Sequence, residues 1–233
     1  MKNIKTILIF TAFVSVSFLF GQNCQEIYPF KQGVSFTTQH FNSKNKLTTT
    51  VKQKMLSVEN SGSQYTAQLD NEVFDAKNKS VSKFNSKIIC DGTTLMIDSR
   101  AFSGQGMNDM PAGTNIEVKF SGDNFDFPLN AAEGQTLKDV SFGSESYMNG
   151  MKIMSFNMKI TNRKVEAIEK VTVPAGTFEA YKISYISELK TMGMTKKYKT
   201  ISWIAKGVGM IKSENYDDKG TLNSYSQLSE FTQ

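Results

Sequence analysis

The stretch MSFNMKIT (Met154–Thr161) alternates apolar and polar residues along its whole length. Successive side chains of a β-strand point to opposite faces of the sheet, so this alternation predicts a strand with one buried and one wetted face. The same rhythm recurs in Tyr65–Asp70 and in Ile116–Ser121, which read YTAQLD and IEVKFS. We therefore expect half-buried strands along most of the chain.

Short turn signals separate the strand-like segments. Each contains proline, which presets φ, or asparagine, aspartate or glycine, which tolerate a positive φ. They are Asn42–Asn45, Asn60–Gly62, Ala76–Lys79, Asp91–Gly92, Pro174–Thr177 and Asp217–Gly220. Their regular spacing favours an antiparallel meander over parallel units, which need helical segments between strands. We predict a mostly β fold, a single antiparallel meander forming a strongly curved sheet or open half-barrel, with at most short helices.

Two segments lack the alternation and are predicted to be irregular or helical. The first, Ser99–Asn115, is rich in glycine and methionine. The second is Leu129–Ser146, in which Asn130–Glu133 is expected to form one helical turn.

The N-terminus has the features of a secretion signal. Lys2 and Lys5 precede an apolar run that ends at Phe20, and Gly21 is a small residue suited to the signal peptidase. The run is shorter than the roughly 20 apolar residues that cross a membrane. We expect residues 1–21 to be a signal peptide and residues 22–233 to form one exported β domain without a transmembrane segment. The predicted location is periplasmic or secreted.

The two cysteines bear on both anchoring and stability. Cys24 follows Asn23, whereas lipidated cysteines normally follow a small residue, so free secretion is favoured over a lipid anchor. Outside the cytoplasm, Cys24 and Cys90 are expected to form a disulfide. For cysteines 66 positions apart, chain entropy assigns such a bridge about 4 kcal/mol. The alternative is two unpaired thiols, one of them buried.

The charge pattern does not indicate a nucleic-acid partner. The chain has 27 basic and 22 acidic residues, and two of the basic residues, Lys2 and Lys5, belong to the signal. The remaining lysines are scattered among acids and form no basic stripe, which is typical of a solvated surface.

Catalytic motifs are missing from the sequence. It contains no nucleotide-binding loop, serine-hydrolase elbow or dinucleotide fingerprint. The single histidine, His40, excludes a histidine-rich zinc cluster and is interpreted as a strand-end residue instead of a catalytic base. A carboxylate site built from Asp91, Asp98 and Asp109 stays open as a distant alternative. We predict no enzymatic activity, no cofactor and no metal.

Methionines occur in short clusters. They are Met107, Met110, Met148, Met151, Met154, Met158, Met192 and Met194. Thioethers can select Cu(I). A two-residue period, however, places Met154 and Met158 on one face of a strand and Met151 on the other. We therefore favour core or pocket lining over a copper site, because methionine fills irregular apolar space.

The second half of the chain resembles a known family of exported proteins. The segments are Gly134–Leu137, Val171–Phe178, Tyr181–Ile183, Trp203–Glu214 and Leu222–Phe231. They resemble the TapB-like family, which is similar in turn to the LolA/LolB-type half-barrels of the cell envelope. The first half matches only in its order of strands and in the Ile89–Gly92 turn. No activity or catalytic residue is agreed for this family, so the resemblance assigns none here.

The apolar side chains on the inner face of a curved sheet must pack either against one another or against a bound ligand. Our leading hypothesis is a non-enzymatic extracytoplasmic envelope protein that binds a lipid or other apolar ligand in the concavity, with a lipid or a lipidated envelope protein as partner. The predicted ligand-binding residues are Met154, Phe156, Met158, Tyr181, Ile183 and Trp203. As the only tryptophan, Trp203 is also expected to be a core anchor with a paired indole N–H. The alternative is a structural or protein-interaction module of the cell surface with a packed core and no ligand.

Overall fold

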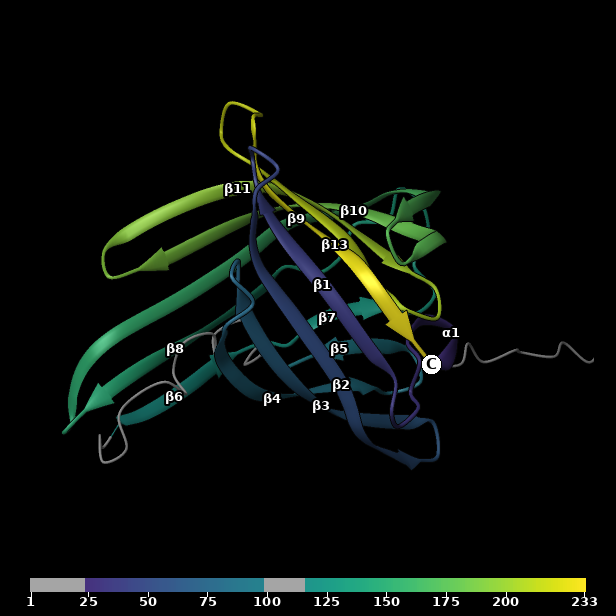
Figure 1. The fold of residues 1–233 in the computed structure, drawn as a ribbon, viewed down its shortest axis with the longest axis horizontal. Coiled ribbons are helices and arrows are strands. Elements are labelled where there is room, and N and C mark those ends of the chain that lie inside the picture. The colour runs from purple at the N-terminus through teal and green to yellow at the C-terminus, as the bar shows by residue number, and fades with distance from the viewer. Residues whose placement is uncertain (1–23, 99–115) are drawn as a thin grey trace, which may run out of the picture.

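The computed structural model describes residues 24–98 and 116–233. The predicted signal peptide (1–21) and the predicted irregular segment 99–115 lie outside these residues. The described part forms one antiparallel, 13-stranded sheet with one short helix. The sheet is strongly curved and open (Figure 1), which confirms the predicted fold class.

The element order follows the meander predicted from the sequence. The helix α1 is Cys24–Ile27, and the strands are β1 Ser35–Asn42, β2 Leu47–Ser61, β3 Gln64–Asp75, β4 Ser80–Cys90, β5 Thr94–Ile97, β6 Ile116–Gly122, β7 Phe125–Pro128, β8 Val140–Met148, β9 Met151–Val173, β10 Gly176–Thr191, β11 Met194–Ala205, β12 Gly209–Tyr216 and β13 Leu222–Thr232. In space the order is β6-β8-β9-β10-β11-β12-β13-β1-β2-β3-β4-β5-β7. Each predicted turn joins two consecutive strands, because its residues supply the backbone angles that a hairpin needs.

The prediction for Leu129–Ser146 is wrong in its second half. Residues 129–139 are irregular, but Val140–Met148 is strand β8 and no helical turn forms at Asn130–Glu133. On β8 the buried side chains include Ser144 and Ser146. Small polar residues at interior positions hide the apolar–polar rhythm, so the strand could not be seen in the sequence.

The two edge strands of the open sheet are neighbours in the chain. Strand β6 lies at one edge and β7 at the other, and only Asp123 and Asn124 separate them in the chain. The segment after β7 runs along β9, where the backbone N–H of Leu137 donates to the Arg163 carbonyl at 2.8 Å. The sheet therefore curls until its last strand faces the opposite edge region.

A buried arginine fastens edge strand β7 to the interior strand β9. Arg163 on β9 is fully buried, and its guanidinium donates to the Asp126 carboxylate at 2.5 Å and to the Lys138 carbonyl at 2.6 Å. The same group lies 4.6 Å from the centre of the Phe125 ring. Because Asp126 and Phe125 belong to β7, the arginine holds the edge strand against the interior.

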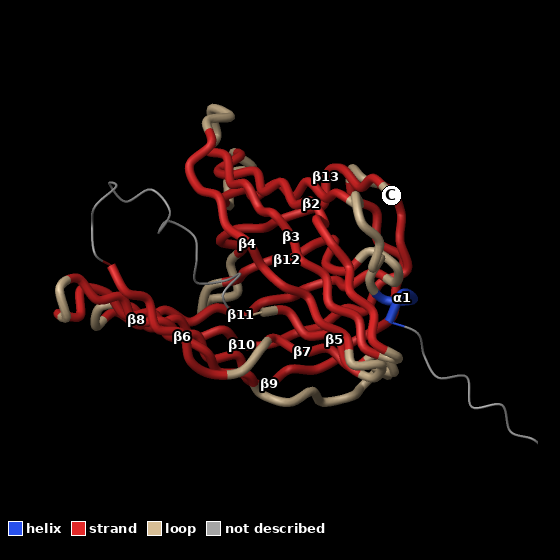
Figure 2. Tube along the Cα trace, turned by 90° about the horizontal axis from the view of Figure 1, so that it is seen from below, coloured by secondary structure: helices blue, strands red, loops and turns tan. Residues whose placement is uncertain are grey.

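The N-terminal segment closes one end of the curved sheet, which we call the closed end. Helix α1 lies there (Figures 1 and 2), and a disulfide between Cys24 and Cys90 ties it to the end of β4, as predicted. The next residues, Tyr28 and Phe30, are buried. A Cβ atom on Gly209 would lie 2.9 Å from the Tyr28 ring, so this close packing requires glycine.

The opposite end is the open rim. Strands of a meander alternate in direction, so every second turn lies at the same end. Residues 43–46, 76–79, 149–150, 192–193 and 217–221 are these turns. The β8–β9 and β10–β11 hairpins extend away from α1 (Figures 1 and 2), and β6 runs along β8 to its end, where Ile116 pairs with Met148. We call these two hairpins the arm.

Candidate ligand-binding cavity

Three adjoining cavities follow the inner face of the sheet from the closed end towards the rim. Their volumes are ≈ 30 Å³ beside Tyr28 and Gly209, ≈ 260 Å³ in the middle and ≈ 440 Å³ nearest the rim. Met210 lines all three, and His40 and Ser226 line the two larger ones. The shared residues make the two larger cavities neighbouring compartments of one concavity, in the size range of small-molecule sites.

Much of the lining of this concavity is apolar. The apolar residues include Ile88, Ile97, Ile211 and Leu228 in the middle cavity and Phe125, Phe142, Met158 and Ile160 near the rim. Met210, at the junction, is 37 % exposed although it points into the concavity. An unbranched thioether at that position can adapt its shape to a guest.

A ladder of neutral polar groups crosses the cavity nearest the rim. The Ser187 and Thr200 hydroxyls are 3.2 Å apart, Thr200 donates to Asn215 Oδ1 at 2.9 Å, and Asn215 Nδ2 donates to Ser224 Oγ at 3.2 Å. The four residues come from β10, β11, β12 and β13 and all line the cavity. Their hydrogen bonds satisfy one another, so the stripe is polar without carrying charge.

A second neutral ladder lies in the middle cavity. The Gln53 amide donates to Asn71 Oδ1 at 2.6 Å, and Asn71 Nδ2 donates to Ser86 Oγ at 3.0 Å. All three residues line the cavity. Asn71 is buried, and its amide is satisfied because it also donates to the Phe84 carbonyl at 3.0 Å.

Ionisable groups are few on these walls. Burial lowers the pKa of His40 below its ordinary value of 6.5, which favours the neutral imidazole. Burial raises the pKa of the Tyr185 phenol, whose hydroxyl lies 2.9 Å from Ser202 Oγ. Lys212 is paired with Glu214 at 2.7 Å. Among the described residues, the lining of the two larger cavities thus has no unpaired charge at neutral pH.

The predicted ligand-binding residues on β9 lie at different depths. Met158 lines the cavity nearest the rim, and Phe156 packs against the core with its ring centre 6.3 Å from that of Phe142. Met154, further towards the rim, is 45 % exposed. The three residues share one face of the strand, but only Met158 borders the cavity.

The other predicted residues lie in the core. Tyr181 and Ile183 are buried, and the Tyr181 ring packs against Phe127 at 5.2 Å. Trp203 points to the opposite face from its neighbour Ile204, which lines the smallest cavity. Its indole N–H donates to the Glu169 carboxylate at 2.8 Å, as expected for a core anchor. A ligand-binding role for the six residues stays a prediction.

Sequence reasoning missed the residues at the junction of the cavities. Met210 and Ile211 both line the middle cavity, although consecutive residues of a regular strand face opposite ways. The register between β11 and β12 shifts between Trp203 and Ile204, and this irregularity turns both side chains inward. Gly209, which marks the irregularity, is the one signal in the sequence that points to it.

A family model described as DUF3108-like matches residues 31–228. The chain belongs to the DUF3108-like family. No match to a curated protein was found. Among solved structures, this DUF3108-like chain is similar to a Bacteroides fragilis protein described as exported, with a YmcC-like fold. The two are 23 % identical with a TM-score of 0.75, over 90 % of this chain and 100 % of the other.

A second solved structure has the same fold. It is a Parabacteroides distasonis protein described as a lipoprotein, 22 % identical with a TM-score of 0.72, over 91 % of this chain and 100 % of the other. Both descriptions agree with the periplasmic or secreted location predicted from the sequence. The likeness to TapB-like and LolA/LolB-type proteins stays a prediction.

Among residues 24–98 and 116–233, no group of three or more histidine, cysteine, aspartate or glutamate side chains is arranged to hold a metal ion. No helix in the same residues has the length and hydropathy needed to span a membrane.

Proposed function

We propose that this DUF3108-like protein is a non-enzymatic exported envelope protein that binds a lipid or another apolar ligand in the concavity of its curved sheet. The proposal is carried by the two adjoining cavities of ≈ 260 Å³ and ≈ 440 Å³, with a largely apolar lining and neutral polar ladders. The N-terminal secretion signal and the resemblance to LolA/LolB-type half-barrels support it. A lipid, or a lipidated envelope protein that offers its acyl chain, is the partner that fits.

The two kinds of lining match the two parts of a lipid. Each methylene group that leaves water for the apolar lining contributes about 0.8 kcal/mol. The ladder from Ser187 to Ser224 offers hydroxyl and amide groups to an ester, amide or hydroxyl of the guest. Such groups need hydrogen bonds once they are buried, and the ladder supplies them without charge.

The alternative is a structural or protein-interaction module with a packed core. A packed core would bury Met210, whereas this side chain is 37 % exposed inside the concavity. The exposure favours a guest, because an adaptable side chain beside open space is a common feature of binding surfaces.

Native mass spectrometry of the protein recovered from the exporting cell tests the proposal. We expect a co-purified lipid, and after its removal we expect added lipid to raise both mass and melting temperature. A Ser226→Phe variant should lose this uptake, because Ser226 lines both larger cavities and the ring would fill the space between them. Asn223→Phe, at an exposed position on the same strand, is the matched control.

A folded, stripped protein that neither gains mass nor changes its melting temperature with any lipid would exclude the lipid and favour the packed module.

A further inference from the structure

The arm at the open rim ends in exposed methionines. Met151 is 68 % exposed, Met192 67 % and Met194 63 %. Thr191 at the end of β10 pairs with Phe156, so the turn that follows lies beside Met154 on β9. We call Met148–Met154 and Met192–Met194 the methionine tips. Large apolar side chains exposed at two neighbouring hairpin ends are typical of a contact site.

The backbone at Met192 gives a second, independent observation. Met192 has a φ of 44°, and every other described non-glycine residue with a positive φ is an asparagine. A left-handed conformation brings Cβ close to the backbone, so glycine and asparagine are the usual residues in such turns. A methionine that is held in this conformation and exposed to water suggests a function for its side chain.

Lysines surround the methionine tips. The charged residues within Met148–Phe156 and Lys190–Lys197 are Lys152, Lys190, Lys196 and Lys197, with no acid among them. Lys152 pairs with Glu145 at 2.9 Å and Lys197 with Glu188 at 3.0 Å. Lys190 and Lys196 form no ion pair with any acid in the described part of the chain. Glu117 on β6 also lies beside the β8–β9 tip, opposite Tyr147, so the unpaired positive charge is at the β10–β11 tip. Exposed methionines beside these two lysines complement a membrane surface with anionic headgroups.

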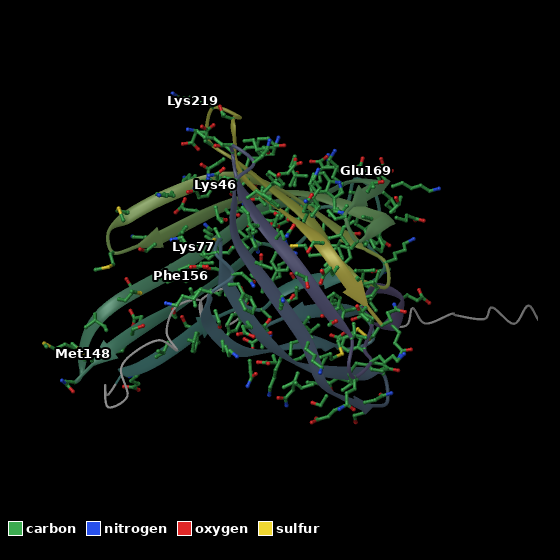
Figure 3. All side chains as sticks on the ribbon, in the orientation of Figure 1. Lys46, Lys77, Met148, Phe156, Glu169 and Lys219 are labelled. Carbon is green, nitrogen blue, oxygen red and sulfur yellow. A yellow bond between two sulfur atoms is a disulfide. The ribbon has the colours of Figure 1, made fainter. Side chains whose placement is uncertain are left out.

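An apolar track joins the tips to the cavity. On β9, Ile160 is buried, Met158 lines the cavity, Phe156 is half-buried and Met154 is exposed, all on one face of the strand. Figure 3 shows Met148 at the end of the arm and Phe156 nearer the body of the protein. A guest moving along this face would stay in contact with apolar side chains between the tips and the concavity.

We propose that the methionine tips insert into the interfacial region of an anionic lipid membrane and that the surrounding lysines hold them against the headgroups. This docking places the end of the apolar track at the membrane. It goes beyond ligand binding, because the tips would bind a membrane whether or not the cavity holds a lipid.

Vesicle sedimentation with the processed, exported protein tests the docking. We expect binding to vesicles of phosphatidylethanolamine and phosphatidylglycerol, weaker binding as salt rises, and little binding to pure phosphatidylcholine. Met192→Ser combined with Met194→Ser should weaken binding about tenfold, because two apolar side chains no longer enter the interface. Lys190→Glu combined with Lys196→Glu should weaken vesicle binding at least as much.

Matched controls separate local contact from net charge and general hydrophobicity. Lys77→Glu combined with Lys219→Glu makes the same change in charge at two polar rim turns, and Leu56→Ser removes an apolar residue that is 44 % exposed elsewhere. Both controls should bind vesicles nearly as the unchanged protein does.

Three outcomes would overturn the docking proposal. One is equal binding by tip variants and controls, and another is equal affinity for anionic and neutral vesicles. The third is self-association that the methionine changes abolish in the absence of any vesicle binding, which would assign the tips to a second copy of the chain. Native mass spectrometry of the same variants keeps this test apart from the cavity, because lipid uptake should persist when docking fails.

Discussion

The two ends of the curved sheet are built in different ways. At the closed end a disulfide, a helical turn and buried aromatic rings cover the strand ends, and the adjoining cavity shrinks to ≈ 30 Å³. At the open rim the strands end in hairpin turns, and the cavity there measures ≈ 440 Å³. Stability is therefore concentrated at one end and access at the other.

The rim itself contains two kinds of turn. Asn42, Asp75 and Asp217 each begin a polar turn, in which the side chain accepts two backbone N–H bonds of 2.8 to 3.1 Å. Such local hydrogen bonds define the turn and leave it hydrophilic. The turns at Asn149 and Met192 instead carry exposed methionines. This contrast restricts the proposed membrane contact to the arm.

The largest expected effect concerns the closed end. Replacing both Cys24 and Cys90 with serine should lower the free energy of unfolding by about 4 kcal/mol, because the bridge closes a long loop. Reversible denaturant unfolding measures the loss, and the unchanged protein in reductant should match the variant. At low denaturant the folded variant should still bind anionic vesicles. A loss below about 1 kcal/mol would mean that packing alone fixes this end.

The next effect concerns the contact between edge strand β7 and strand β9. Arg163→Met should lower the free energy of unfolding by about 3 kcal/mol, because it leaves the Asp126 carboxylate without its buried partner. The lower part of the usual range applies, since the Asp126 side chain is 30 % exposed and can recover some water. Lys83→Met, which breaks an exposed pair with Glu72, should cost less than about 1 kcal/mol. Equal losses in the two variants would contradict the role given to Arg163.

A smaller effect of opposite sign is expected at the rim. Met192→Asn should raise the free energy of unfolding by about 1 kcal/mol, because asparagine tolerates the left-handed conformation better than methionine does. The same variant should bind vesicles more weakly. The reciprocal change, Asn78→Met in a polar turn, should destabilise the protein by a similar amount. If Met192→Asn is destabilising instead, the strain assigned to this turn does not exist.

These comparisons also show which features could be predicted from the sequence. Alternation and turn chemistry are local, so they predicted the strands and hairpins correctly. Strand β8 was missed because Ser144 and Ser146 occupy interior positions. The cavity lining at Met210 depends on a register shift, and the contact of Arg163 with Asp126 depends on how far the sheet curls. Both result from long-range pairing. Gly209 is the one local sign of the register shift, and no residue next to Arg163 indicates its contact with Asp126.

The smallest expected effect comes from His40, which lies where the two larger cavities meet. Burial lowers its pKa below the ordinary value of 6.5, so the folded protein favours the neutral ring. The contribution to stability is then fully present above that value. It is lost as the pH falls, because the unfolded chain takes up the proton first. Lys212, with its partner Glu214, is the nearby charged group on the cavity wall.

Comparing the unchanged protein with His40→Gln isolates this contribution, since the carboxylates that titrate in the same range are common to both. Between about pH 7.5 and about pH 5 the unchanged protein should lose more unfolding free energy than the variant. Its lipid uptake should also fall more steeply, because a protonated imidazole puts a charge between two cavities whose described lining residues carry no other unpaired charge. Parallel pH profiles for the two proteins would mean that His40 stays in contact with bulk water, and the junction of the cavities would then be open to solvent.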